Sequence, residues 1–283
     1  MYNTIKKWRG TMKIAAIQIC SALEPEKNIT RIQSFIEMAK GQEPELEAVF
    51  LPEVFYSMSD GTQATPYLVE KGNEHYKAIQ NLAVKNNIFL IGGTAATVDP
   101  NTEKVLNRTY NFSPKGEELE NYDKMHLFSV DLSRHKSNTV IDEGIVYQCG
   151  NEPKLLELNK DWKIGLGICF DLRFPELYRH YFSQGANLMT VASAFTVPTG
   201  KAHWETLVRA RAIENQSYVV AVGQWGNHNS KIKTFGHSMI VSPWGDVIAN
   251  AGEGEGYILA DLQIDKVEKV KGRLDVRPKL TTI

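Results

Sequence analysis

The sequence predicts an α/β protein in which helices cover a mixed β-sheet. Strand and helix patterns alternate over the first 95 residues, which is typical of parallel strands joined by helices. Turn signals between apolar runs, at 113–116 (SPKG) and 243–246 (PWGD), indicate antiparallel hairpins as well. The two kinds of connection together predict a sheet that is not purely parallel.

The elements of the first half follow from the spacing of apolar residues. The run 13–20 (KIAAIQIC) is apolar and contains β-branched residues, so it predicts an inner strand. Apolar side chains recur at helical spacing in 28–40 and in 74–87, which predicts two helices. Further strands are expected at 46–51, 88–94, 105–112 and 117–122, the last two as a hairpin.

The second half continues the alternation. Strands are expected at 163–168, 187–192, 217–222, 236–242, 247–250 and 256–262. Helices are expected at 175–184 and at 203–216, the second beginning after the helix breakers Pro198 and Gly200. The stretch 129–151 has no clear periodicity, and such long irregular segments are often functional.

No low-complexity linker divides the chain, so we expect a single domain over 13–283. It would follow a polar and basic N-terminal extension, residues 1–12, that lacks the apolar core of a signal peptide. The 283 residues, with 42% hydrophobic and 23% charged, have an ordinary composition for a soluble globular enzyme.

Net charge and cysteine count exclude several classes of protein. A formal net charge of −1 and the lack of a basic run argue against nucleic acid or an anionic membrane as partner. No apolar run approaches the roughly 20 residues that span a bilayer. Three cysteines (Cys20, Cys149 and Cys169) make a disulfide framework improbable and favour a reducing, cytoplasmic location. Without a CxxC or Cys/His cluster, no metal site is expected.

Cys169 directly follows the predicted strand 163–168, at a point where the chain must turn sharply. An isolated cysteine is more often a small buried hydrophobe than a nucleophile. Two features of its surroundings favour catalysis: glycines that permit close backbone approach, and charges in the short segment that follows, namely Gly165, Gly167, Asp171, Arg173 and Glu176. A thiol held rigidly above a sheet can serve as a nucleophile.

Two further charged residues occupy comparable places. Glu53 follows the apolar run 48–52 (AVFLP), so it is either a helix cap, a buried ion pair or a general base with a raised pKa. Lys124 lies in 122–128 (YDKMHLF), where it is either a surface lysine or a group that stabilises a thiolate and an oxyanion. Together with Cys169 they could form an acyl-transfer site.

A Cys–His dyad is the rival design for acyl transfer. His126, His203 and His237 are the candidates, of which His203 would cap or pack at the start of a helix and His237 would lie in a strand. The residues alone leave both designs open.

Three segments resemble, in order and rough spacing, the signature segments of the nitrilase superfamily of carbon–nitrogen hydrolases. They are 51–53 (LPE), 122–128 (YDKMHLF) and 165–176 (GLGICFDLRFPE). Similar support comes from 193–204 (SAFTVPTGKAHW), 209–216 (RARAIENQ), 236–238 (GHS) and 243–245 (PWG), so the resemblance spans residues 13 to about 262.

The resemblance implies an αββα sandwich that forms a homodimer through paired helices. It also implies a catalytic triad of Glu53, Lys124 and Cys169 that needs no metal or organic cofactor. A second glutamate of the family corresponds best to Glu143, with Asp142 as the competitor.

The segment 193–204 is most similar to the Nit branch, which includes ω-amidases and deaminated-glutathione amidases. This implies hydrolysis of the terminal amide of a small carboxylate-bearing substrate through a thioester, with release of ammonia. N-carbamoyl hydrolysis and nitrile hydrolysis on the same triad remain alternatives, as does a catalytically silent binding protein.

Four residues are expected to contact the substrate in this reaction. The backbone N–H of Phe170 would join Lys124 in stabilising the oxyanion. Arg173 would clamp a substrate carboxylate, or else form an ion pair with Asp171 or Glu176. The remaining candidates are Thr199, as a hydrogen-bond donor to the same carboxylate, and Phe195, as a wall of the pocket.

Overall fold

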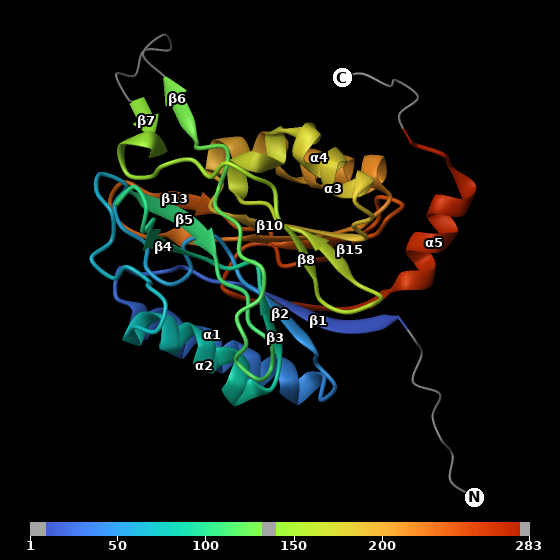
Figure 1. Cartoon of the computed structure of the whole chain (residues 1–283), viewed down its shortest axis with the longest axis horizontal. Helices are drawn as coiled ribbons and strands as arrows, with labels where there is room; N and C mark the ends of the chain where they lie inside the picture. The colour runs from blue at the N-terminus through green and yellow to red at the C-terminus, as the bar shows by residue number, and fades with distance from the viewer. Residues whose placement is uncertain (1–9, 132–139, 278–283) are drawn as a thin grey trace, which may run out of the picture.

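Two β-sheets stack face to face, and a pair of helices covers the outer face of each (Figure 1). The computed structural model describes residues 10–131 and 140–277. The four-stranded sheet has the order β16 (Gly256–Gln263), β1 (Thr11–Gln18), β2 (Ala48–Phe50), β3 (Phe89–Ile91). The six-stranded sheet has the order β15 (Val247–Asn250), β14 (Met239–Val241), β11 (Tyr218–Gly223), β10 (Leu188–Ser193), β9 (Lys163–Gly165), β8 (Leu155–Glu157).

The layers follow the αββα order that was expected. The four-stranded sheet is covered by α1 (Pro25–Gln42) and α2 (Glu74–Asn86), and the six-stranded sheet by α3 (Pro175–Ser183) and α4 (Val197–Asn215) (Figure 1). Both sheets are mixed: β1, β2 and β3 run parallel, as do β9, β10 and β11. The strands that flank these parallel sets, β16, β8, β14 and β15, pair antiparallel. The predicted mixed α/β architecture is confirmed.

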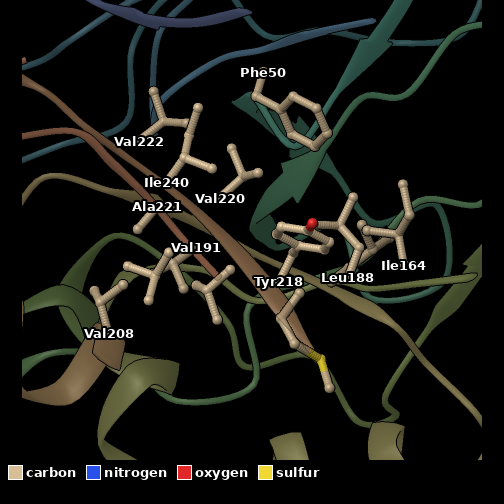
Figure 2. Packing of buried hydrophobic residues seen from close by; sticks show 14 of the residues in the cluster. Phe50, Ile164, Leu188, Val191, Val208, Tyr218, Val220, Ala221, Val222 and Ile240 are labelled. Atoms are coloured by element: carbon tan, nitrogen blue, oxygen red, sulfur yellow. The ribbon is translucent and has the colours of Figure 1, made fainter. Parts of the chain in front are cut away.

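Strand β1 is apolar on both faces because both faces are buried. Ile14 and Ala16 belong to the cluster between the two sheets, whereas Ala15 and Ile17 pack in the cluster beneath α1 and α2. In Figure 2, Phe50 of β2 lies near the side chains of β10 and β11. Fully burying a side chain of this size contributes about 1.5–3 kcal/mol relative to exposure, so the inter-sheet cluster is the main source of rigidity beneath the site.

Several smaller elements connect the layers. They are the hairpins β4 (Thr94–Val98) with β5 (Val105–Thr109), β6 (Ser129–Asp131) with β7 (Val140–Asp142), and β12 (Trp225–Asn227) with β13 (Lys233–Phe235), the 3₁₀ turns η2 (Glu143–Ile145) and η3 (Cys169–Arg173), and the last helix, α5 (Ile264–Arg273). The irregular stretch expected at 129–151 therefore contains a hairpin and a turn. No helix in the two described ranges is both long and apolar enough to cross a membrane.

Two expected elements are wrong in their details. Helix α4 begins at Val197, not at residue 203, because Pro198 occupies the first turn, where its missing N–H needs no partner. Gly200 lies inside the helix against Phe235, and a Cβ there would come within 2.3 Å of the Phe235 ring. These residues therefore start and pack the helix, and do not break it.

The hairpin expected between 105–112 and 117–122 forms only in part. The segment after the turn returns antiparallel: backbone N–H groups of Thr109 and Leu119 donate to the carbonyls of Tyr122 and Asn111, and bridges join Phe112 to Glu118 and Arg108 to Asp123. No regular strand forms over 117–122, and β5 pairs along its length with β4. The strand expected at 88–94 is divided into β3 and β4, because Gly92 turns the chain between them with a φ of 80°. At the N-terminus, β1 begins at Thr11, and residues 1–9 of the expected extension lie outside the described residues.

Candidate active site

Chain segments from both sheets converge on one pocket. Glu53 follows β2, Lys124 lies beyond β5, and Cys169 begins η3 just after β9. The pocket is lined by Glu53, Phe128, Glu143, Cys169, Phe170, Arg173, Ala194, Phe195, Thr196 and Thr199. Every site residue predicted from the sequence therefore lines it, except Lys124, which is fully buried behind the two glutamates.

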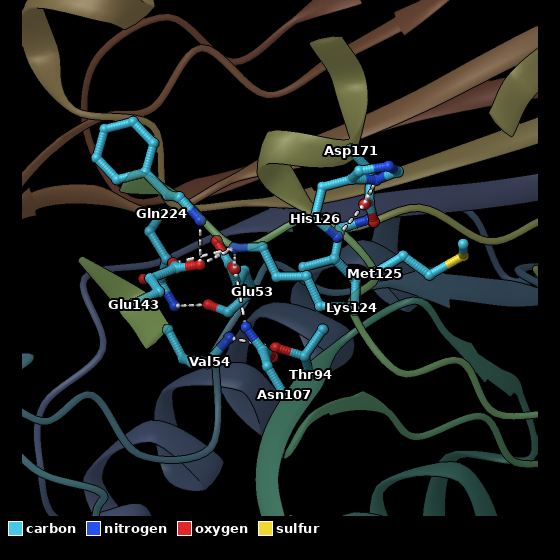
Figure 3. Close-up of polar contacts among 12 residues, drawn as sticks. Glu53, Val54, Thr94, Asn107, Lys124, Met125, His126, Glu143, Asp171 and Gln224 are labelled. Carbon is cyan, nitrogen blue, oxygen red and sulfur yellow. Dashed lines mark hydrogen bonds and ion pairs between the residues drawn. The ribbon is translucent and has the colours of Figure 1, made fainter. Parts of the chain in front are cut away.

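Lys124 is the centre of a buried charge cluster (Figure 3). Its Nζ lies 2.7 Å from Glu53 Oε1 and 2.7 Å and 3.0 Å from the two carboxylate oxygens of Glu143. Burial alone would lower the pKa of this lysine, but the charges of Glu143 and Glu53 raise it well above its ordinary value. Lys124 is therefore an ammonium ion at any physiological pH, and the surface-lysine alternative is wrong.

Glu53 is only 2% exposed and is held on several sides. Its Oε1 accepts hydrogen bonds from Lys124 and, at 2.9 Å, from Asn107 Nδ2, and its backbone carbonyl accepts one from Gln224 at 3.0 Å. Burial raises the pKa of the carboxyl, and the charge of Lys124 acts in the opposite direction. The ion-pair alternative thus describes the geometry correctly, and a raised pKa also suits proton transfer near neutral pH.

Glu143, and not Asp142, is the second carboxylate on Lys124. Glu143 Oε2 also accepts a hydrogen bond from the backbone N–H of Phe128 at 2.9 Å, which fixes the carboxylate in place. Asp142 instead accepts from the backbone N–H of Gly144 and caps the turn η2. The geometry therefore separates the two candidates that the sequence left open.

Cys169 adopts a left-handed backbone conformation, with φ of 47°, at the sharp turn between β9 and η3. A residue with a side chain rarely adopts this conformation, and it costs roughly 1–3 kcal/mol that surrounding contacts must offset. Burial raises the pKa of the thiol, and the nearby charge of Glu53 raises it further. Cys169 is therefore protonated at neutral pH and needs a base to become a nucleophile.

The buried carboxylate of Asp171 ties the lysine segment to the cysteine turn, a contact that the sequence did not predict. It accepts hydrogen bonds from Tyr122 Oη at 2.8 Å, from the backbone N–H of Ile168 at 2.9 Å, and from the backbone N–H and the Nδ1 of His126 at 3.1 Å and 2.7 Å. Tyr122 and His126 stand two residues on either side of Lys124. The dense polar and aromatic pattern of 122–128 indicates that this segment is not a plain exposed strand. The pattern does not indicate that Asp171 is the residue it contacts.

The three candidate histidines have other roles than as a base for Cys169. His126 contacts Asp171 and stacks on Phe174 with ring centroids 3.6 Å apart. His203 Nδ1 lies 3.2 Å from Arg173 Nη2, and His237 stacks on Phe235 at 4.2 Å. None of the three lines the pocket, so the geometry does not support a Cys–His dyad.

Arg173 supplies a cation to the pocket wall. Its guanidinium lies 5.6 Å from the ring centroid of Phe170 and 5.4 Å from that of Phe195. Among the residues described, the ion pairs include none between Arg173 and either Asp171 or Glu176. Thr199 also lines the pocket, and its hydroxyl lies 2.9 Å from that of Thr196.

The pocket holds a thiol and a carboxylate, and an ammonium is buried directly behind the carboxylate. These are the groups that hydrolysis through an acyl-thiol intermediate requires. The sequence matches the carbon–nitrogen hydrolase family over residues 13–272, and the chain belongs to this family.

Individual relatives are similar over almost their whole length. The chain is 35% identical over 261 residues to a deaminated glutathione amidase of Synechocystis sp., covering 92% of this chain and 94% of the relative. It is 37% identical over 270 residues to omega-amidase NIT3 of Saccharomyces cerevisiae, covering 92% and 90%. The crystal structure of Saccharomyces cerevisiae Nit3, a member of branch 10 of the nitrilase superfamily, superposes with a TM-score of 0.81 at 31% identity, covering 95% of this chain and 96% of that one.

These comparisons confirm the family, the Nit-type resemblance and the sandwich fold predicted from the sequence. The protein is an enzyme that hydrolyses carbon–nitrogen bonds.

Proposed function

We propose that the enzyme hydrolyses the terminal amide of a small carboxylate-bearing substrate and releases ammonia. The observation that carries the proposal is the pocket itself, where the Arg173 cation and the Cys169 thiol line the same cavity beside the buried Glu53–Lys124 pair. The names of the relatives, deaminated glutathione amidase and omega-amidase, support the same class of substrate.

The first half of the reaction forms a thioester. Glu53 accepts the proton of the Cys169 thiol as the sulfur attacks the amide carbonyl carbon. The carbonyl oxygen becomes an oxyanion that Lys124 and the backbone N–H of Phe170 stabilise, a contribution of about 10²–10³ in rate for one donor. The protonated Glu53 then gives its proton to the amide nitrogen, the C–N bond breaks, and ammonia leaves.

The second half hydrolyses the thioester. Glu53, ionised again, takes a proton from water as the water oxygen attacks the thioester carbonyl carbon. The C–S bond then breaks, the proton returns to sulfur, and the product is a carboxylic acid. Glu143 holds Lys124 in place throughout, because its carboxylate accepts from the ammonium at 2.7 Å.

At the other end of the pocket, Arg173 pairs with the substrate carboxylate. The rings of Phe170 and Phe195 both lie close to the guanidinium, and the Thr199 hydroxyl is a further donor. A guanidinium presents two parallel N–H groups, which suits the planar geometry of a carboxylate.

Arg173→Ala is expected to raise KM for an amide with a distal carboxylate about 10- to 100-fold, because a charged hydrogen bond contributes roughly 1.5–3 kcal/mol. The effect is measured by steady-state kinetics on an acidic amide and on its neutral analogue. Arg173→Lys is the control, because lysine keeps the positive charge but lacks the two parallel N–H groups of the guanidinium. We expect Arg173→Lys to be intermediate. Equal losses on the acidic and the neutral amide would contradict a carboxylate clamp.

The proposed activity is tested by ammonia release from a substrate panel, comparing the wild type with Cys169→Ala. The panel contains α-ketoglutaramate, deaminated glutathione, glutamine, an N-carbamoyl amino acid and a simple nitrile. We expect turnover of one of the first two, and a loss on the order of 10⁴-fold or more in Cys169→Ala, as for other nucleophile deletions. Turnover of only the carbamoyl compound or the nitrile would keep the Glu53–Lys124–Cys169 triad and overturn the substrate class.

If no compound of the panel is hydrolysed, and if Cys169 of the folded protein also fails to react with iodoacetamide, a binding protein without catalysis would be supported.

We also propose that the enzyme is a cytoplasmic homodimer paired through helices that include α4. The exposed side chains of Ile213 on α4 and Trp244 in the adjacent turn, 50% and 53% exposed, supply apolar surface for such a contact.

A further inference from the structure

We infer that Asn107 is a positioning residue that orients the Glu53 carboxylate so that one of its oxygens faces Cys169. The inference rests on the proposed function, in which Glu53 is the base. Nothing in the sequence pattern singles out Asn107, which lies in the middle of β5 among alternating residues.

Two side-chain donors meet on the same oxygen of Glu53 (Figure 3). Asn107 Nδ2 and Lys124 Nζ both donate to Oε1, at 2.9 Å and 2.7 Å. With both donors on Oε1, the second oxygen, Oε2, is the one left to accept the proton of the Cys169 thiol. Lys124 alone could turn with the carboxylate, because an ammonium donates in several directions, whereas a second donor from a separate segment, β5, restricts that rotation.

Asn107 also holds the lysine through its backbone. Its carbonyl accepts a hydrogen bond from the backbone N–H of Lys124 at 2.9 Å. One residue of β5 therefore contacts both the base and the electrophilic lysine, the first through its side chain and the second through its main chain. A side-chain substitution removes only the first contact, so the two roles can be separated experimentally.

The amide oxygen of Asn107 is evidence that this side chain is present for its bond to Glu53 and not for the stability of the fold. Asn107 is 1% exposed, and its Oδ1 is buried without a hydrogen-bond partner among the described residues. Leaving a buried acceptor unpaired destabilises a fold, whereas an apolar side chain of the same shape avoids that penalty. An asparagine at this position is thus unfavourable for packing alone, and the bond to Glu53 gives a reason for it.

Removal of the Asn107 amide is expected to change the pKa of the Glu53 carboxyl in one direction. The titratable groups that interact with Glu53 are Lys124, Glu143, Cys169 and Tyr147, and Asn107 adds a donor that does not titrate. A donor to a carboxylate favours the charged form, so its loss raises the pKa of Glu53. Ionisation of the base then requires a higher pH.

The test is the rate at which iodoacetamide alkylates Cys169 as a function of pH, followed by mass spectrometry of the peptide that contains Cys169. This readout needs no substrate, so it is independent of which amide the enzyme uses. For Asn107→Leu we expect the alkylation of Cys169 to be about tenfold slower at neutral pH and its acid limb to move to higher pH. The loss in rate is smaller than the roughly 10²–10⁴-fold that a positioned base contributes, because Glu53 itself remains. The midpoint of thermal unfolding is expected to stay unchanged or to rise.

Asn215→Leu is the matched control, because Asn215 is also buried with an unpartnered Oδ1 but lies at the end of α4. We expect its alkylation profile to match the wild type. Asn107→Val, with a side chain that strands favour, repeats the test in a second apolar variant. Unfolding of both Asn107 variants would assign the residue to the framework and overturn the proposal.

Glu53→Gln separates this inference from the proposed function. If Glu53→Gln abolishes the acid limb while Asn107→Leu retains the wild-type profile, the role of Asn107 is wrong and the base assignment stands. If Glu53→Gln itself retains the wild-type profile, the base assignment fails and the inference fails with it.

Discussion

Lys124→Met is expected to lower the free energy of unfolding by about 3–5 kcal/mol and the rate of hydrolysis by at least about 10²–10³-fold. The stability loss arises because the buried Glu53 and the partly buried Glu143 would face each other with no cation between them. The rate loss arises because the oxyanion would lose a charged donor. Chemical denaturation and steady-state kinetics measure the two effects on the same variant.

Two controls distinguish the buried cluster from an ordinary ion pair. Lys163→Met removes the lysine of a surface pair with Glu157 and is expected to change stability by less than about 1 kcal/mol. Adding Glu143→Gln to Lys124→Met should recover part of the lost stability, since one unpaired carboxylate is removed, but no activity. A single Lys124→Met variant as stable as the wild type would contradict the charge cluster.

Glu53→Gln is expected to lower kcat/KM by about 10²–10⁴-fold, because an amide cannot accept the thiol proton. In the wild type, the same carboxyl should set an acid limb in the pH profile. Burial raises its pKa above the ordinary 4.5, so the ionised, active fraction increases as pH rises through that higher value. Lys124 keeps its charge at alkaline pH because its own pKa is raised, so it contributes no loss near neutrality.

The measurement is kcat/KM on the preferred amide across the acid and neutral range. The acid limb of the wild type is expected above pH 4.5, and the residual activity of Glu53→Gln should lack that limb. An acid limb at or below the ordinary value of a glutamate would show that Glu53 is not the titrating base. Near-normal activity in Glu53→Gln would show the same.

The sequence predicted those elements whose apolar spacing is strong. Helix α1 buries Ile32, Phe35, Ile36 and Ala39 at helical spacing, and it was expected within a few residues of its true ends. Helix α5 buries only Val267 and Val270 among many charged residues, so its pattern gave no signal. Proline and glycine usually break helices, so the sequence predicts a start for α4 that is too late. Only the packing of Gly200 on Phe235 shows that both residues belong to the helix.

For the site, the sequence placed Glu53, Lys124 and Cys169 in separate motifs at element ends. It could not supply the contacts between distant segments, such as Asp171 with Tyr122 or Asn107 with Glu53, since nothing in the local pattern of either residue indicates its partner. The sequence also could not decide whether Asp142 or Glu143 contacts Lys124. The 3₁₀ turn η2 directs the two adjacent carboxylates to different partners, and only the structure shows which one reaches the lysine.

The pairing of β1 with β16 joins the two ends of the described chain, from Thr11 opposite Gln263 to Gln18 opposite Gly256. The ribosome releases β1 long before β16, so one edge of β1 stays unpaired while the intervening residues are synthesised. Such an edge readily pairs with other chains. The four-stranded sheet that supports Glu53 is therefore completed only after β16 has been synthesised. Contacts between residues so far apart in the sequence also form slowly.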